Sequence, residues 1–183
     1  MNKKDILKIL ENNGWDMNIP EVTEDMRKDK NLILEAIKND GLRDQGSNIE
    51  YANEKILNDK KFILKALDHS AYILEYTTNA INSDKDIILK AVEGMGSAIQ
   101  YASDKLKKNK KIALKSVQME GTAIQFLDEK LKNDTEIIIE AVKNDHSALS
   151  YISKDVILKK KLFYEIVKSN GLALEYADAS LKK

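Results

Sequence analysis

Apolar residues recur along most of the chain with a period of 25 residues. The clearest copy is DKDIILKAVEGMGSAIQYASDKLKK, from Asp84 to Lys108. Similar runs begin at Asp59, Asn109, Asp134 and Lys159. A longer copy begins at Asp29 and carries about five extra residues near Gly41–Gln45. Self-similarity at a fixed period of this size is typical of solenoid proteins, in which each repeat packs on its neighbours.

Within one repeat, the fourth, fifth, sixth, eighth and ninth positions are apolar or small. In the copy at Asp84 these residues are Ile87, Ile88, Leu89, Ala91 and Val92. This spacing predicts a first helix of about ten residues. The aspartates that open several copies (Asp59, Asp84 and Asp134) are expected to cap that helix. The glycines that follow the apolar run (Gly94, Gly96, Gly121 and Gly171) are expected to end it.

A second, shorter helix is predicted from the motif small, large, polar, aromatic, as in Ser97–Ala102. A closing turn follows, with Ser103 as its cap and Leu106 buried. One repeat cannot bury its own apolar face, so stacked neighbours are expected to form a continuous core. The largest losses of stability are expected in the central copies, where Leu89→Ala or Leu114→Ala should cost roughly 2–5 kcal/mol.

These patterns predict an all-α fold, a short α-solenoid of about six 25-residue helical repeats. Residues 1–28 form a degenerate N-terminal unit, in which Trp15 has no counterpart in the other copies. Residues 29–183 are expected to pack as one domain of tandem repeats, since no linker or shift of composition interrupts them.

Composition narrows the classes of function. The formal net charge is zero, so no global attraction to nucleic acid or to an anionic membrane is expected. The chain has no cysteine and two histidines, His69 and His146, which occupy different positions in distant repeats. A metal site, a cofactor and catalysis are therefore not expected. The sequence lacks a signal-peptide core and a long apolar run, which favours a cytoplasmic protein with no membrane association.

Two runs resemble a known family of repeats. D-K-x-I-I-L-K-A-V at Asp84–Val92 and N-G-x-A-L-x-Y-A at Asn170–Ala177 are similar to the repeats called domain of unknown function 4116. The resemblance covers roughly residues 29–183, with residues 5–28 as a weaker extension. It implies helical tandem repeats of a kind found in bacterial and large-virus proteins, and no catalytic motif. The expected location is accordingly the cytoplasm of a bacterium or, for a viral protein, of the infected cell.

The first candidate surface is a row of lysines. The seventh position of the first helix is Lys65, Lys90 and Lys115 in three successive copies, with glutamates in the copies beyond. Such a row could dock an acidic protein or a phosphate backbone, although a solvated helix face is the commoner meaning of surface lysine. Arg27 and Arg43, the two arginines, lie outside the row, which disfavours sequence-specific reading of nucleic acid. The aromatic position near the end of each copy is interpreted as packing between repeats rather than as a platform for bases.

Two further surfaces are candidates for binding a protein. The loops between the two helices vary most between copies, and Tyr72, Met95 and Met119 are the residues chosen from them. The C-terminal repeat has an apolar end that could pack against a partner or, weakly, against a second copy. The residues chosen for this end-on packing are Ile157, Leu158, Phe163 and Tyr164.

The sequence therefore predicts a non-enzymatic protein–protein interaction module, and the identity of its partner stays open. The alternative is sequence-independent binding of nucleic acid through the lysine row. A third hypothesis is an inhibitory binder, such as a phage protein that blocks a bacterial defence complex.

Overall fold

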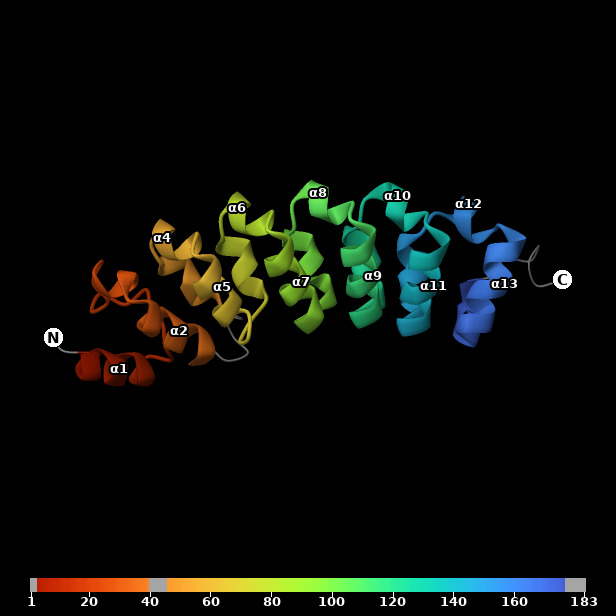
Figure 1. The fold of residues 1–183 in the computed structure, drawn as a ribbon. Coiled ribbons are helices and arrows are strands. Elements are labelled where there is room, and N and C mark those ends of the chain that lie inside the picture. Colours follow the sequence, from red (N-terminus) through yellow and green to blue (C-terminus); the bar gives the residue numbers. More distant parts are fainter. Residues whose placement is uncertain (1–2, 40–45, 177–183) are drawn as a thin grey trace. The chain divides into compact units, whose positions relative to one another are not determined.

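The structure is a computed structural model, and it describes residues 3–39 and 46–176. Throughout these residues the regular secondary structure is helical (Figure 1). The prediction of an all-α chain of tandem repeats is confirmed, because the same succession of helices returns in each copy. The insertion expected near residues 41–45 and the end of the last copy, residues 177–183, lie outside the described residues.

Each repeat begins with an α-helix. These first helices are α2 (Lys30–Asn39), α5 (Lys60–Ala66), α7 (Lys85–Gly94), α9 (Lys110–Met119), α11 (Thr135–Asn144) and α13 (Lys160–Ser169). The predicted aspartate caps are confirmed: Asp134 Oδ1 accepts hydrogen bonds from the N–H groups of Glu136 and Ile137 at 3.0 and 3.3 Å. Asp59 and Asp84 cap α5 and α7 in the same way.

The second helix of each repeat is a 3-10 helix, where the sequence indicated a helix without specifying its type. These helices are η2 (Ser47–Tyr51), η3 (Tyr72–Tyr76), η4 (Gly96–Tyr101), η5 (Gly121–Phe126), η6 (His146–Tyr151) and η7 (Gly171–Tyr176). Each of these 3-10 helices is five or six residues long, in keeping with a helix type that rises about 2 Å per residue and is rarely long. It buries the small and large residues of the motif, such as Ala98 and Ile99, both 0% exposed.

Within the described residues, a four-residue α-turn joins each repeat to the one that follows. These turns are α4 (Glu54–Leu57), α6 (Asn79–Asn82), α8 (Asp104–Lys107), α10 (Glu129–Lys132) and α12 (Lys154–Ile157). Leu106 is buried as expected. Ser103 stands at the predicted cap position of α8, but its side chain makes no capping hydrogen bond. That part of the prediction is wrong.

The chain forms two compact units, residues 1–90 and 91–183. The first unit contains α1 (Lys3–Asn12), the short 3-10 helix η1 (Met26–Lys28) and the repeats that start with α2 and α5, together with most of α7. In it α2 packs on α5, and η2 packs on η3. The degenerate N-terminal segment is tied to the repeats by the N–H of Met17, which donates to the buried Asn48 at 2.9 Å. Packing of all repeats as one domain stays a prediction.

In the second unit the repeats stack in order. Helix α11 packs between α9 and α13 (Figure 1). The 3-10 helices η4, η5, η6 and η7 also pack on one another in chain order. Each later first helix also packs on the preceding 3-10 helix, α9 on η4 and α11 on η5. This stacking of helical pairs is the arrangement of an α-solenoid.

The buried positions of the repeat differ slightly from those expected from the sequence. Ile112 and Ile138 are 0% exposed, as are most residues at the fourth and fifth positions of the repeats. Leu89 and Leu114, at the sixth position, are half-buried. A smaller loss is now expected for these two leucines than for the fully buried isoleucines, because their side chains keep part of their surface in water.

Candidate functional site

The glycines after the first helices serve the contact between repeats. A Cβ on Gly96 would lie 2.5 Å from the carbonyl oxygen of Ser116, and one on Gly121 would lie 2.3 Å from that of Ala141. Both glycines open a 3-10 helix instead of ending the first helix, so the prediction of their role as helix ends is wrong. Glycine is needed because the next helix brings its backbone against them.

Side chains of the inter-helix loops also reach across to neighbouring repeats. Asn144 Oδ1 accepts from the N–H of Gly121 at 2.7 Å, and its Nδ2 donates to the carbonyl of Gln118 at 3.0 Å. Glu120 accepts from the N–H of Ser97 at 2.8 Å. The variable loops, which the sequence suggested as a recognition ridge, therefore carry part of the packing between repeats.

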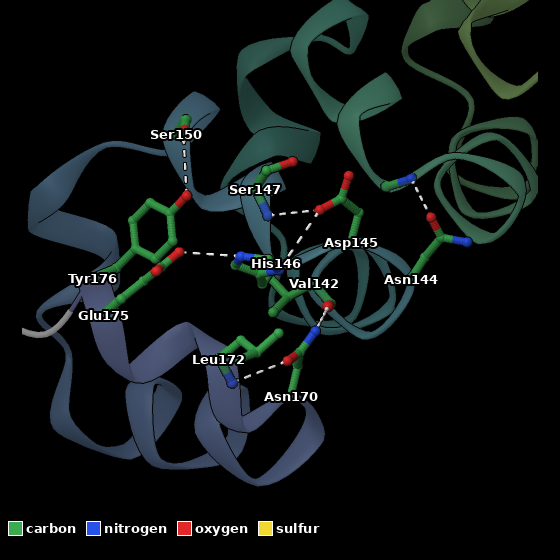
Figure 2. A network of polar contacts seen from close by, with 11 residues as sticks. Val142, Asn144, Asp145, His146, Ser147, Ser150, Asn170, Leu172, Glu175 and Tyr176 are labelled. Carbon is green, nitrogen blue, oxygen red and sulfur yellow. Dashed lines mark hydrogen bonds and ion pairs between the residues drawn. The ribbon is translucent and has the colours of Figure 1, made fainter.

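The same region of the last two repeats forms a polar network (Figure 2). Asn170 donates to the carbonyl of Val142 at 3.0 Å, and His146 Nε2 lies 3.1 Å from a carboxylate oxygen of Glu175. Asp145 accepts a hydrogen bond from the N–H of Ser147 at 2.8 Å. Hydrogen bonds from the backbone and the side chain of Ser147 lower the pKa of the Asp145 carboxyl group. The network joins η6 to η7. The imidazole of His146 thus takes part in a contact between two repeats.

The ridge residues differ in exposure. Tyr72 and Met95 are half-buried, and the Tyr72 N–H donates to Ser70 Oγ at 3.2 Å. Met119, the last residue of α9, is 44% exposed. Of the three residues chosen from the ridge, Met119 offers the largest share of its surface.

One lysine of the row is paired with a carboxylate. Lys65 is exposed, and the Lys90 amino group lies 2.7 Å from Asp68 Oδ1. This hydrogen bond and the charge of Lys90 lower the pKa of the Asp68 carboxyl group. Lys115 is half-buried and belongs to the second unit, whereas Lys65 and Lys90 belong to the first. Pairing of Lys90 reduces the free positive charge available to a phosphate backbone.

The aromatic position is partly covered by packing. Tyr51 lies under the guanidinium of Arg27, whose carbon is 5.3 Å from the ring centroid. A hydrogen bond with Glu50 and partial burial raise the Tyr51 pKa to about 12. Tyr176 packs edge-on against His146 and lies 3.4 Å from the Ser150 hydroxyl (Figure 2). Tyr151, 42% exposed, is the most open of the described rings of this set.

Exposed large apolar side chains concentrate in the last two repeats. Apart from Met119, those of the described chain are Tyr151, Leu158, Tyr164, Leu172 and Leu174. Of the residues chosen for end-on packing, Leu158 and Tyr164 are exposed, at 38% and 71%. Ile157 and Phe163 are buried, at 6% and 5%, so their proposed part in end-on packing is corrected. We call Leu158, Tyr164, Leu172 and Leu174 the C-terminal apolar surface.

Leu172 and Leu174 were missed by the sequence analysis. Leu172 is 65% exposed, and its N–H donates to Asn170 Oδ1 at 3.1 Å (Figure 2). The exposure of Leu172 could have been predicted from the sequence, because small polar residues occupy its position in three preceding copies: Ser97, Thr122 and Ser147. Leu174 gave no such signal, since large apolar residues occupy its position in every preceding copy from Ile49 onward.

The apolar surface adjoins a shallow cavity of about 370 Å³. Its lining combines residues of η6 and α12 with Leu158 and Tyr176. Among the described residues no group of three or more His, Cys, Asp or Glu is placed to hold a metal ion. The helices of the described chain include none long and apolar enough to cross a membrane.

Comparison with known proteins bears on the family alone. Neither the curated proteins nor the solved structures provide a match to the chain. One family model matches four times in tandem, over residues 2–43, 42–81, 84–129 and 109–157. The first match includes the N-terminal segment that the sequence analysis treated as a weaker extension. The chain therefore belongs to the family described as Domain of unknown function (DUF4116).

Proposed function

We propose that the chain is a non-enzymatic module that binds another protein through the C-terminal apolar surface. The observation that carries this proposal is the exposure of Tyr164 and Leu172, 71% and 65%, in a chain whose other copies cover most large apolar side chains. Exposed apolar groups concentrated in one part of a soluble domain mark sites of interaction with other proteins. Aromatic residues are also enriched at the centre of such interfaces.

The ridge and the lysine row support this function less strongly. The ridge side chains Glu120, Asn144 and Asn170 hold repeats together, and changes there act on stability as well as on recognition. The lysine row has Lys90 paired with Asp68, which favours a solvated face over a docking band for phosphates.

The experiment is affinity capture with tagged protein from a lysate of the source cells, in nuclease-treated and untreated halves. Three forms are compared: the natural chain, the double variant Tyr164→Ser/Leu172→Ser, and Met119→Ser as a matched control on the ridge. All three substitutions are at exposed side chains, so the folded state is retained.

The expected result is a stoichiometric protein that survives nuclease and binds the natural chain and Met119→Ser but not the double variant. A partner lost with Met119→Ser alone would place binding on the ridge. Capture that disappears on nuclease treatment, and falls steeply with salt, would replace the proposal with binding of nucleic acid.

A further inference from the structure

In the second unit, the first helices of two repeats pack on the 3-10 helix of the repeat before: α9 packs on η4, and α11 packs on η5. The 3-10 helix of the last repeat, η7, has a similar face. Ile99 in η4 and Ile124 in η5 are 0% exposed. Leu174 occupies the same position in η7 and is 49% exposed.

Glycine at the start of η7 gives a second, independent sign. Gly96 and Gly121 leave no room for a Cβ, because the backbone of α9 or α11 fills that space. A Cβ on Gly171 would meet nothing within 4 Å. The space that a neighbouring backbone fills beside Gly96 and Gly121 is therefore empty of described residues beside Gly171.

The charge at this end defines the chemistry of a partner. Lys110, the first residue of α9, lies 2.8 Å from both Asp134 and Glu136 at the start of the next helix. In the first unit, Lys60 makes the same double contact with Asp84 and Asp86, at 2.8 and 2.7 Å. Lys160 begins α13 at the equivalent position. It is exposed, and no ion pair joins it to another residue in the described part of the chain.

We propose that this face binds an amphipathic α-helix of a partner protein, one that begins with an Asp-x-Asp or Asp-x-Glu cap and has a small residue where it passes Gly171. This inference rests on the proposed function and names the kind of partner. Leu174 would pack against the apolar side of that helix, Gly171 would admit its backbone, and Lys160 would bind the two carboxylates. Helix-in-groove binding of this kind is a common mode of recognition.

A second copy of the chain is a poorer occupant. Its helices α9 and α11 already have neighbours on both sides, and the apolar residues Ile6 and Leu10 of α1 are buried. Helix α13 of another copy exposes Tyr164, but it begins with Lys160 and Lys161 instead of the carboxylates that would pair with Lys160.

The probe for the test is a synthetic peptide with the sequence of residues 134–151. It contains the helix that packs on η5 in the chain and carries the Asp134 and Glu136 pair. The full chain is labelled with ¹⁵N and ¹³C-methyl groups, and NMR chemical shifts follow the titration with peptide. We expect saturable shifts in α13 and η7, including the Leu174 methyl groups.

Two variants make the test specific. Gly171→Leu should weaken binding about tenfold or more, because its side chain occupies the space for the incoming backbone. The matched control is Gly94→Leu, also at a glycine where a Cβ meets nothing within 4 Å, and it should bind like the natural chain. Lys160→Glu should weaken binding severalfold. A peptide with Asp134→Lys and Glu136→Lys should recover that loss, which keeps the proposal testable if Gly171→Leu does not fold.

Several results would overturn the inference. One is the absence of shifts with about 1 mM peptide, a concentration that detects even weak binding. Others are contacts from residues 177–183 to Leu174 in the protein alone, or shifts of η7 that depend on protein concentration without peptide. If Tyr164→Ser/Leu172→Ser loses the captured partner while Gly171→Leu keeps it, the proposed function stands and the helix-docking inference fails. If both variants keep the partner, both fail.

Discussion

Gly121 lies directly against the carbonyl oxygen of Ala141, so that a Cβ on this glycine would lie 2.3 Å from the oxygen. The contact joins η5 to the first helix of the next repeat. It fixes how closely two repeats approach and explains why the position is buried. The stack therefore depends on the absence of a side chain at one point as much as on the apolar residues around it.

The variant Gly121→Ala tests this contact. We expect it to lower the free energy of unfolding by about 1–3 kcal/mol, because the added methyl group forces α11 away from η5. Urea denaturation followed by circular dichroism measures the change. Gly171→Ala is the matched control, since a Cβ there meets nothing within 4 Å. Equal stabilities of the two variants would contradict the proposed role of Gly121.

Burial within one helix gives a second prediction. Ile112 is 0% exposed and Leu114 is half-buried, although both lie in α9. Ile112→Ala should cost about 2–5 kcal/mol, and Leu114→Ala should cost clearly less, because less apolar surface returns to water. Chemical denaturation of the two variants under identical conditions compares them. A larger loss for Leu114→Ala would restore the expectation based on sequence.

The side chain of Asn144 provides a third prediction. It satisfies the N–H of Gly121 and the carbonyl of Gln118, both in the preceding repeat. Asn144→Ala should lower stability by about 1–3 kcal/mol, because two backbone groups lose their partner. Asn133→Ala is the control: Asn133 donates to Glu129 within its own turn, so its removal should cost less. Hydrogen exchange at the Gly121 amide should also quicken in Asn144→Ala alone.

Acid should weaken the contacts between repeats. The pKa of Asp59 is lowered chiefly by its hydrogen bond with Lys30, and also by the Phe62 N–H that it caps. Burial raises the pKa of Asp134, but its bonds with Lys110 and Ile137 outweigh this and leave the pKa below the ordinary 3.8. A lowered pKa in the folded state means that the stabilisation is complete above the unfolded pKa and is lost as the pH falls through the folded one.

Asp134→Asn tests the acid effect. Asparagine keeps the capping oxygen, as Asn109 does for α9, but cannot titrate. We expect a modest loss of stability at pH 7 and a smaller decline of the denaturation midpoint when the pH is taken below 3.8. Urea midpoints measured between neutral and acid pH provide the comparison. If the urea midpoint falls with pH as steeply in Asp134→Asn as in the natural chain, Asp134 does not contribute to the acid dependence.

The repeat, its period and its helices could be predicted from the amino-acid pattern alone. The spacing of residues such as Ile87, Ile88 and Val92 predicts a helical face, and Asp134 before such a face predicts its cap. These features are local, because capping and helical periodicity depend on neighbours within a few residues. For the same reason the exposed Leu158 and Tyr164 could be chosen from a comparison of copies.

The role of the recurring glycines and the burial of individual apolar residues became clear from the packing of the repeats. In the sequence, Gly96 and Gly121 are placed like residues that end a helix. In the structure they are required because the backbone of a helix about 20 residues further along the chain lies against them. Leu174 has the same residue type as its buried counterpart Leu149, and it is exposed because no later helix of the described chain packs on η7 in the way that α11 packs on η5. Burial depends on neighbours that are distant in sequence, and a repeat pattern does not contain them.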